Sequence, residues 1–316
     1  MKERTVGAID LGSNSLRLLM ARAEKGVIRL LGSELRETRL GEGLITGGKF
    51  FHPARERTLK ALTSLLEIMK KQVDNGVIVA TSAVREAADG KQLLDDIAAF
   101  SPFPVRLLSG EDEAFYGFRG AVGAMGSDED EEDVLVLDLG GRSTELSWQE
   151  KGVCRGCSLP FGAVNLTSSF LFSLSEENIQ RVKEFVYELL DKQSGLLPGK
   201  KRRKLLGLGG TVTTLAALSL NLRQYNPEQV HRYCLSRAEV KKWGQFFLHS
   251  SRQKIIQMLP FSARRADIIP AGTSALFSVM EYLGYDSISV SEGGLLLGIL
   301  LELTGCQVDL TLFPGK

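Results

Sequence analysis

The 316-residue chain contains little cysteine and histidine, and its charges nearly cancel. There are 39 Lys and Arg residues against 38 Asp and Glu, so no overall field attracts nucleic acid or an anionic membrane. The four cysteines are too few to indicate a disulfide framework in a chain of this length, which favours a reducing compartment. The three histidines, His52, His231 and His249, show no metal-ligand spacing.

Long hydrophobic runs are also absent. The N-terminal residues lack the apolar core of a signal peptide, and the apolar stretch Leu295–Leu303 is far too short to be a transmembrane helix. We therefore expect a cytoplasmic protein with no membrane and no DNA partner. No glycine turn is followed by a Walker lysine or fits the Rossmann fingerprint, which excludes both of those nucleotide-binding classes.

The sequence does contain two similar segments, AIDLGSNSLRLLMAR (Ala8–Arg22) and VLDLGGRSTELSWQE (Val136–Glu150). Each is an apolar run that ends in Asp-Leu-Gly, turns on small residues and continues with strand-like alternation. Asp10 and Asp138 occupy the equivalent position. A strand that ends at an aspartate and turns on glycines offers backbone N–H groups together with a carboxylate for a metal ion. Two such turns facing each other would form a phosphate clamp around a divalent ion.

The order of the expected elements indicates an α/β protein with two related domains. In the first part we expect strands and helices at Thr5–Asp10, Leu16–Ala23, Gly26–Glu34, Pro53–Gln72 (helix), Val77–Ala80, Lys91–Phe100 (helix), Val105–Leu108 and Glu111–Val122 (helix). After a glycine-rich and acidic linker, Gly123–Asp133, we expect Val134–Asp138, Thr144–Trp148, Glu176–Lys192 (helix), Lys204–Leu208, Ser287–Val290 and Leu295–Leu303 (helix). The predicted domains are residues 1–125 and 126–300, with a cleft between them, and residues 301–316 pack back on the first domain.

Together with four further segments, the two duplicated turns form a series of six motifs in a fixed order along nearly the whole chain: AIDLGSNS, ATSAVREAADG, LSGEDEAFYGFRGA, VLDLGGRSTEL, LGLGGTVTTLAAL and RRADIIPAG. Together they resemble the exopolyphosphatase and guanosine-pentaphosphate phosphohydrolase family, in its short two-domain form. That family belongs to the superfamily of actin, sugar kinases and heat-shock chaperone ATPases. The resemblance implies two actin-like (ribonuclease H-like) domains, Mg2+, and release of terminal orthophosphate from inorganic polyphosphate or guanosine pentaphosphate. A homodimer is a further expectation from the resemblance.

Three small-residue turns are candidate phosphate sites, because backbone N–H groups and Ser or Asn side chains can donate to phosphate oxygens. Two belong to the duplicated segments, and the third leads into an expected helix, whose N-terminus suits an anion. Their residues are Gly12, Ser13 and Asn14; Gly140, Gly141, Arg142 and Ser143; and Gly209, Gly210 and Thr211. An ordinary hairpin is the alternative for the first turn, and helix capping by Thr211 for the third.

Four carboxylates are candidates for the chemistry. The resemblance implies that Asp10 and Asp138 lie near the divalent ion, which they hold mainly through water; a strand-end cap is the alternative. Glu113 matches the family's catalytic glutamate, a general base that takes a proton from the attacking water. Neighbouring carboxylates would raise its pKa towards neutrality. The resemblance places Glu145 close to the cleft, where it can assist the metal ion or the water.

Two arginines leave alternatives open. Arg85 either holds phosphate oxygens in a fork or forms a surface salt bridge with Glu86 or Asp89. Arg142 replaces the third of three consecutive glycines usual in the family. If the position needs φ > 0, an arginine there destabilises the fold by roughly 1 kcal/mol or more relative to glycine. Its side chain either adds a phosphate clamp or plugs the cleft. A plugged cleft would make the protein an alarmone- or nucleotide-binding sensor with little catalysis, and a kinase of the same superfamily is a third hypothesis.

Overall fold

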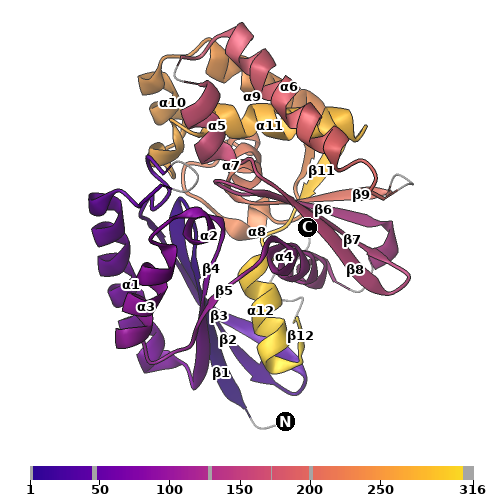
Figure 1. Cartoon of the computed structure of the whole chain (residues 1–316). Helices are drawn as coiled ribbons and strands as arrows, with labels where there is room; N and C mark the ends of the chain where they lie inside the picture. Colours follow the sequence, from indigo (N-terminus) through magenta and orange to yellow (C-terminus); the bar gives the residue numbers. More distant parts are fainter. Residues whose placement is uncertain (1–2, 45–47, 127–129, 172, 199–201, 309–316) are drawn as a thin grey trace.

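The fold contains two six-stranded mixed sheets with the same arrangement of strands (Figure 1). The computed structural model describes residues 3–44, 48–126, 130–171, 173–198 and 202–308. The strand order is β12–β3–β2–β1–β4–β5 in the first sheet and β10–β11–β9–β6–β7–β8 in the second. The strands are β1 (Arg4–Leu11), β2 (Ser15–Glu24), β3 (Val27–Glu37), β4 (Asn75–Ala80), β5 (Val105–Leu107), β6 (Val134–Leu139), β7 (Thr144–Glu150), β8 (Val153–Leu159), β9 (Lys204–Leu208), β10 (Cys234–Ser236), β11 (Ser287–Val290) and β12 (Gln307–Val308).

Each sheet contains an antiparallel meander, β1–β2–β3 or β6–β7–β8, whose first strand also pairs in parallel with a later strand, β4 or β9. The hairpins at the end of the two meanders turn on the same dipeptide. Lys25 and Gly26 have φ of 52° and 84°, and Lys151 and Gly152 have φ of 51° and 74°. Two successive positive φ values are typical of the tight turn that matches strand twist. The duplication therefore extends from the sequence to the backbone.

The helices fall into groups that cover the faces of the two sheets. None in the described part of the chain is long and apolar enough to span a membrane. They are α1 (His52–Gln72), α2 (Ser82–Glu86), α3 (Gly90–Phe100), α4 (Gly110–Met125), α5 (Ala163–Phe170), α6 (Glu176–Lys192), α7 (Gly210–Ser219), α8 (Pro227–Val230), α9 (Arg237–Leu248), α10 (Arg252–Met258), α11 (Ile269–Tyr282) and α12 (Leu295–Thr304).

Helix α4 follows strand β5 of the first sheet but packs on the second sheet, whereas α12 follows strand β11 of the second sheet but packs on the first. One face of the first sheet buries its apolar side chains against α1 and α3, and the other against α12, which comes last in the sequence. The second sheet packs on one side against α5, α6, α7, α9 and α11, and on the other against α4, which precedes it. In Figure 1, α4 and α12 accordingly lie between the two sheets. Both sheets and both helices therefore meet at the middle of the molecule.

Glycines let α4 and α12 approach until their backbones touch. A Cβ atom at Gly120 would lie 2.0 Å from the carbonyl oxygen of Gly294, and one at Gly298 would lie 2.0 Å from that of Tyr116. Real Cβ atoms do not approach backbone so closely, and a close-packed interior offers no space for relief. This crossing fixes the relative position of the two sheets.

The strands and helices expected from the sequence are present with ends shifted by up to three residues. Strand β3 continues to Glu37 instead of Glu34, because its alternation of exposed and less exposed residues persists. The sequence analysis did not delimit the short helix α2 or the helices between β9 and β11. The domain boundary near residue 126 stays a prediction. Residues 127–129 of the linker and 309–316 of the C-terminal segment lie outside the described residues.

Candidate active site

The two duplicated turns lie against each other and share one backbone geometry. Gly12 N donates to Ser15 O at 3.2 Å, and Gly140 N donates to Ser143 O at 3.0 Å. A Cβ at either glycine would lie 2.9 Å from that same carbonyl, which explains why glycine stands at both positions. A Cβ at Gly141 would lie 2.2 Å from Ser13 Oγ, so the turns are in contact. The structure thus brings the first and second predicted phosphate turns together.

Asp10 and Asp138 are the last residues but one of the central strands β1 and β6, just before these turns. Burial raises the pKa of Asp10 to about 7; the Arg17 charge opposes the rise and the Asp138 charge adds to it. Burial likewise raises the pKa of Asp138 to about 6, again opposed by Arg17. Among the described residues, Asp10 Oδ1 is buried without a hydrogen-bond partner. A buried, unpaired carboxylate oxygen is costly unless a cation or a proton compensates it.

These two carboxylates fit a divalent cation that is bound largely through water. Oxygen ligands suit Mg2+, which gives up its water reluctantly and often keeps only one or two carboxylates from the protein. In the described part of the chain, no group of three or more His, Cys, Asp or Glu side chains is arranged to hold a metal ion directly. The donor set therefore agrees with the expected water-mediated site better than with an all-protein cage.

Glu113 lies on the first turn of α4 and points inward. A capping box formed by Ser109 and Asp112 starts this helix, so Asp112 serves the helix end while Glu113 is buried. Arg85, at the end of α2, donates through Nη1 to Glu113 Oε1 at 2.6 Å and to Leu108 O at 2.7 Å. Arg85 therefore pairs with Glu113 and not with Glu86 or Asp89, and its contact with phosphate oxygens stays a prediction.

The electrostatic surroundings place the titration of Glu113 near neutral pH. Burial raises its pKa to about 7, and the charges of Asp10 and Asp138 act in the same direction. The hydrogen bond and the charge of Arg85 lower it. A carboxyl group with such a pKa is suited to take up a proton at neutral pH.

Glu145 is a neighbour of these groups on β7, where it pairs across the strands with Asp138. Burial raises its pKa well above the usual range, and the charges of Glu113 and Asp138 add to the effect. Ser158 Oγ donates to Glu145 Oε1 at 2.7 Å, and Ser143 also bonds to it. Glu113, Glu145 and both aspartates thus form one electrostatic cluster.

Arg17 is a site residue that the sequence analysis missed. It pairs with Asp10 across β1 and β2, just as Glu145 pairs with Asp138 across β6 and β7. It therefore stands seven residues after the first aspartate, where the second copy carries Glu145. Arg17 could have been found by aligning the two duplicated segments residue by residue through their second strands.

The third turn lies beside Asp138, and a second missed residue, Arg265, packs against it. Gly209 has φ of 90°, and a Cβ there would lie 3.1 Å from Asp138 Oδ1. A Cβ at Gly210, the first residue of α7, would lie 2.0 Å from Arg265 Nη1. Burial and the charge of Arg17 lower the pKa of Arg265 to about 10, whereas the charge of Glu37 raises it. Arg265 belongs to the RRADIIPAG segment but gave no sign of its role there.

The capping role considered for Thr211 is wrong, because Gly209 is the N-cap of α7 and makes no side-chain cap. The Thr211 side chain is buried instead, and its Oγ1 lies 2.3 Å from a Cβ built on Gly272. In the first turn, the carbonyl of Ser13 accepts from Gly41 N at 2.7 Å, and that of Asn14 accepts from Arg39 N at 2.9 Å. These hydrogen bonds connect the first turn to the segment that follows β3.

Arg142 crosses from the second domain to the first. Its Nε and Nη2 donate to Glu86 Oε2 at 2.9 and 2.5 Å, and its Nη1 donates to Leu44 O at 2.8 Å. The side chain is only 4% exposed, and Arg142 is not among the described residues with positive φ, so the expected backbone cost is absent. The guanidinium is thus occupied by protein acceptors, a third outcome besides the clamp and the plug.

Two α/β domains with the same strand arrangement and facing Asp-Gly turns define a protein of the actin-like class. The model of the Ppx/GppA phosphatase family matches residues 19–305, and the chain belongs to that family. This confirms the resemblance found in the sequence motifs and the fold class expected from it.

Known relatives agree with the assignment. Exopolyphosphatase 2 of Mycobacterium tuberculosis is 32% identical over 95% of this chain and 98% of its own length. The bifunctional 3-dehydroquinate synthase/phosphatase of Fusobacterium nucleatum is 30% identical over 93% of this chain, which spans only 46% of that protein. The solved PPX-GPPA enzyme of Aquifex aeolicus superposes with a TM-score of 0.79 at 31% identity, covering 95% of this chain and 100% of that one.

Proposed function

We propose that this protein is a phosphoanhydride hydrolase that releases terminal orthophosphate from inorganic polyphosphate, guanosine pentaphosphate or both. The observation that carries the proposal is Glu113, a buried carboxyl group with a pKa of about 7 beside the two facing Asp-Gly turns. Family membership and the likeness to a mycobacterial exopolyphosphatase support the reaction class. A cytoplasmic location and a homodimer are proposals from the same resemblance.

In the proposed reaction, the turns and the arginines of the cleft bind the phosphate chain. Backbone N–H groups of Ser13 and Gly141 donate to oxygens of the terminal phosphates, and Arg17 and Arg265 balance their charge. Such binding fixes the terminal phosphorus in line with an attacking water, and positioning together with charge stabilisation supplies most of phosphoryl-transfer catalysis.

Glu113 is the proposed general base. Its Oε1 accepts from Arg85, which leaves Oε2 to take the proton of the water that attacks phosphorus. Burial and the nearby charge of Glu113 raise the pKa of Glu145, which acts as a second carboxyl group next to that water. Asp10 and Asp138 would hold Mg2+, which supplies positive charge to the phosphate oxygens when bound.

The alternative, a sensor that binds an alarmone or nucleotide with little catalysis, depended on Arg142 plugging the cleft. The bonds of Arg142 to Glu86 and to Leu44 O do not favour it. A kinase requires an acceptor other than water, and no observation of the described residues points to one.

The test is orthophosphate release in the presence of Mg2+, from long-chain polyphosphate and guanosine pentaphosphate in parallel. We expect release from at least one of them, abolished by a chelator, and the ratio of the two kcat/KM values identifies the preferred substrate. Tight binding of guanosine pentaphosphate without release from either compound would contradict the proposal and support the sensor.

A further inference from the structure

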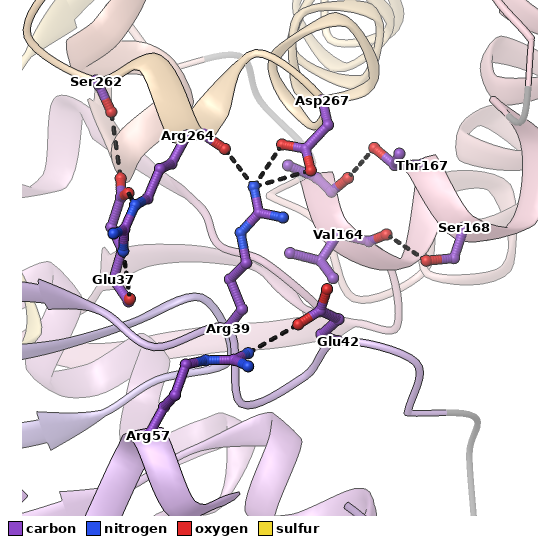
Figure 2. A network of polar contacts seen from close by, with 11 residues as sticks. Glu37, Arg39, Glu42, Arg57, Val164, Thr167, Ser168, Ser262, Arg264 and Asp267 are labelled. Atoms are coloured by element: carbon purple, nitrogen blue, oxygen red, sulfur yellow. Dashed lines mark hydrogen bonds and ion pairs between the residues drawn. The ribbon is translucent and has the colours of Figure 1, made fainter. Parts of the chain in front are cut away.

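The end of β3 is joined to the segment Ser262–Asp267 of the second domain, as Figure 2 shows. Arg39 Nη2 donates to Arg264 O at 2.5 Å and contacts the Asp267 carboxylate at 2.9 Å. Glu37 Oε1 accepts from Ser262 Oγ at 3.3 Å, and Glu37 O accepts from Arg264 Nη1 at 3.2 Å. We call this set of five residues the bridge; it connects the two domains outside the reacting centre.

The segment held by the bridge also carries Arg265. This residue ends the short 3-10 turn Ala263–Arg265, between the Arg264 carbonyl and the Asp267 carboxylate that Arg39 binds. Its guanidinium lies on Gly210, where a Cβ would be 2.0 to 2.3 Å from three of its atoms. Burial lowers the pKa of Arg265, and the charge of Glu37, a residue of the bridge, opposes this effect. The segment Ser262–Asp267 therefore binds the first domain through the bridge, and its Arg265 side chain packs against the third turn.

We propose that Arg39 is a positioning residue, which sets Arg265 over the N-terminus of α7 when the two domains are closed. The inference rests on the proposed function, since it assigns Arg265 to the phosphate-bearing substrate. Arg39 and the segment that it binds come from different domains, so opening of the cleft breaks these contacts and frees Arg265. Arg265 therefore contacts the substrate only when the two domains are closed.

The geometry makes this contact more than a surface ion pair. The Arg39 and Asp267 side chains are 28% and 31% exposed, and the same guanidinium nitrogen also binds a backbone carbonyl. Such half-buried, charge-assisted bonds exceed the small contribution of exposed pairs. Loss of one well-placed charged contact corresponds to about a tenfold change in affinity.

The test compares Arg39→Ala, Arg39→Lys, Arg265→Ala and the double variant of the two alanine changes. Arg57→Ala is the matched control, because Arg57 binds Glu42 and Thr38 O within the first domain. With long-chain polyphosphate, we expect KM to rise about tenfold in Arg39→Ala while kcat changes less than about twofold. Arg39→Lys recovers part of the loss, and Arg57→Ala matches wild type. The double variant is no worse than Arg265→Ala, which shows that Arg39 acts through Arg265.

Independent, multiplying losses in the double variant would overturn the inference, as would an unchanged KM in Arg39→Ala. A second readout does not need hydrolysis: amide exchange of the peptide that contains residues 262–268. It should quicken in Arg39→Ala and remain unchanged in Arg57→Ala, and unchanged exchange in Arg39→Ala also overturns the inference. Failure of the proposed function is seen separately, as absence of orthophosphate release by the wild-type protein.

Discussion

The ionisation of Glu113 depends on its hydrogen bond with Arg85. Burial raises the Glu113 pKa to about 7, and Arg85 counteracts the rise. A general base works only when deprotonated, so kcat falls as the pH decreases through about 7. In Arg85→Gln the opposing charge is lost, and we expect this acid limb to move to higher pH. A pH–rate profile measures the shift; an acid limb at the same pH in both proteins would contradict the assignment.

Asp10 and Asp138 make the folded state sensitive to pH and to Mg2+. Their folded-state pKa values of about 7 and about 6 exceed the ordinary value of 3.8, so the native protein binds protons more tightly than the unfolded chain. The free energy of unfolding therefore decreases as the pH rises from about 4 to about 7. A cation offsets this loss, so Mg2+ should raise Tm at about pH 8 and much less at about pH 5.

Asp138→Asn should lose most of that increase in Tm, whereas Glu111→Gln, a change at an exposed residue of α4, should keep it. Thermal unfolding with and without Mg2+ decides the matter. An equal increase in all three proteins would place the ion elsewhere.

At the scale of single elements, Arg142 ties the second phosphate turn to α2 and to the segment after β3. Arg142→Gly removes three hydrogen bonds from a side chain that is 4% exposed and leaves Glu86 without this partner. We expect the free energy of unfolding to fall by about 2 kcal/mol, measured in urea, with no gain in hydrolysis. Faster orthophosphate release by Arg142→Gly at unchanged stability would show that Arg142 blocks the cleft after all.

The crossing of α4 and α12 leaves no room for an added methyl group. The Cβ of Gly120→Ala would lie 2.0 Å from the backbone oxygen of Gly294, so one of the helices must move. We expect a loss of about 3 kcal/mol or more in the free energy of unfolding. Gly195→Ala is the control, since a Cβ there meets nothing within 4 Å. Similar unfolding curves for both variants would contradict the close contact.

At the scale of the whole molecule, the sequence predicted what depends on local order along the chain. The paired Asp-Gly turns and the first meander follow from periodicity and turn chemistry, whereas Glu113 became a candidate through the family resemblance and strand β8 was not delimited. Arg17 could have been found only by carrying the comparison of the two copies into their second strands. Arg265 could not have been found from the sequence in this way, because its position over Gly210 depends on contacts between segments distant in sequence.

Arg142 illustrates the same limit. Its departure from the family pattern is visible in the sequence, but its partners Glu86 and Leu44 lie 56 and 98 residues away. Helix α2, which carries Arg85 and Glu86, has only five residues and too few turns for a periodic pattern. The sequence therefore predicts which residues carry the chemistry, whereas contacts between distant segments, such as those of Arg142, required the folded chain.

The most direct measurement is orthophosphate release by Glu113→Gln beside Glu111→Gln, with wild type as reference and unfolding curves for all three. Both glutamates lie in the first turn of α4, but Glu113 is buried and Glu111 is not. We predict that kcat decreases about 10²- to 10⁴-fold in Glu113→Gln and stays within about twofold of wild type in Glu111→Gln. Wild-type turnover by a well-folded Glu113→Gln would contradict the account, because no base would then be needed at this position.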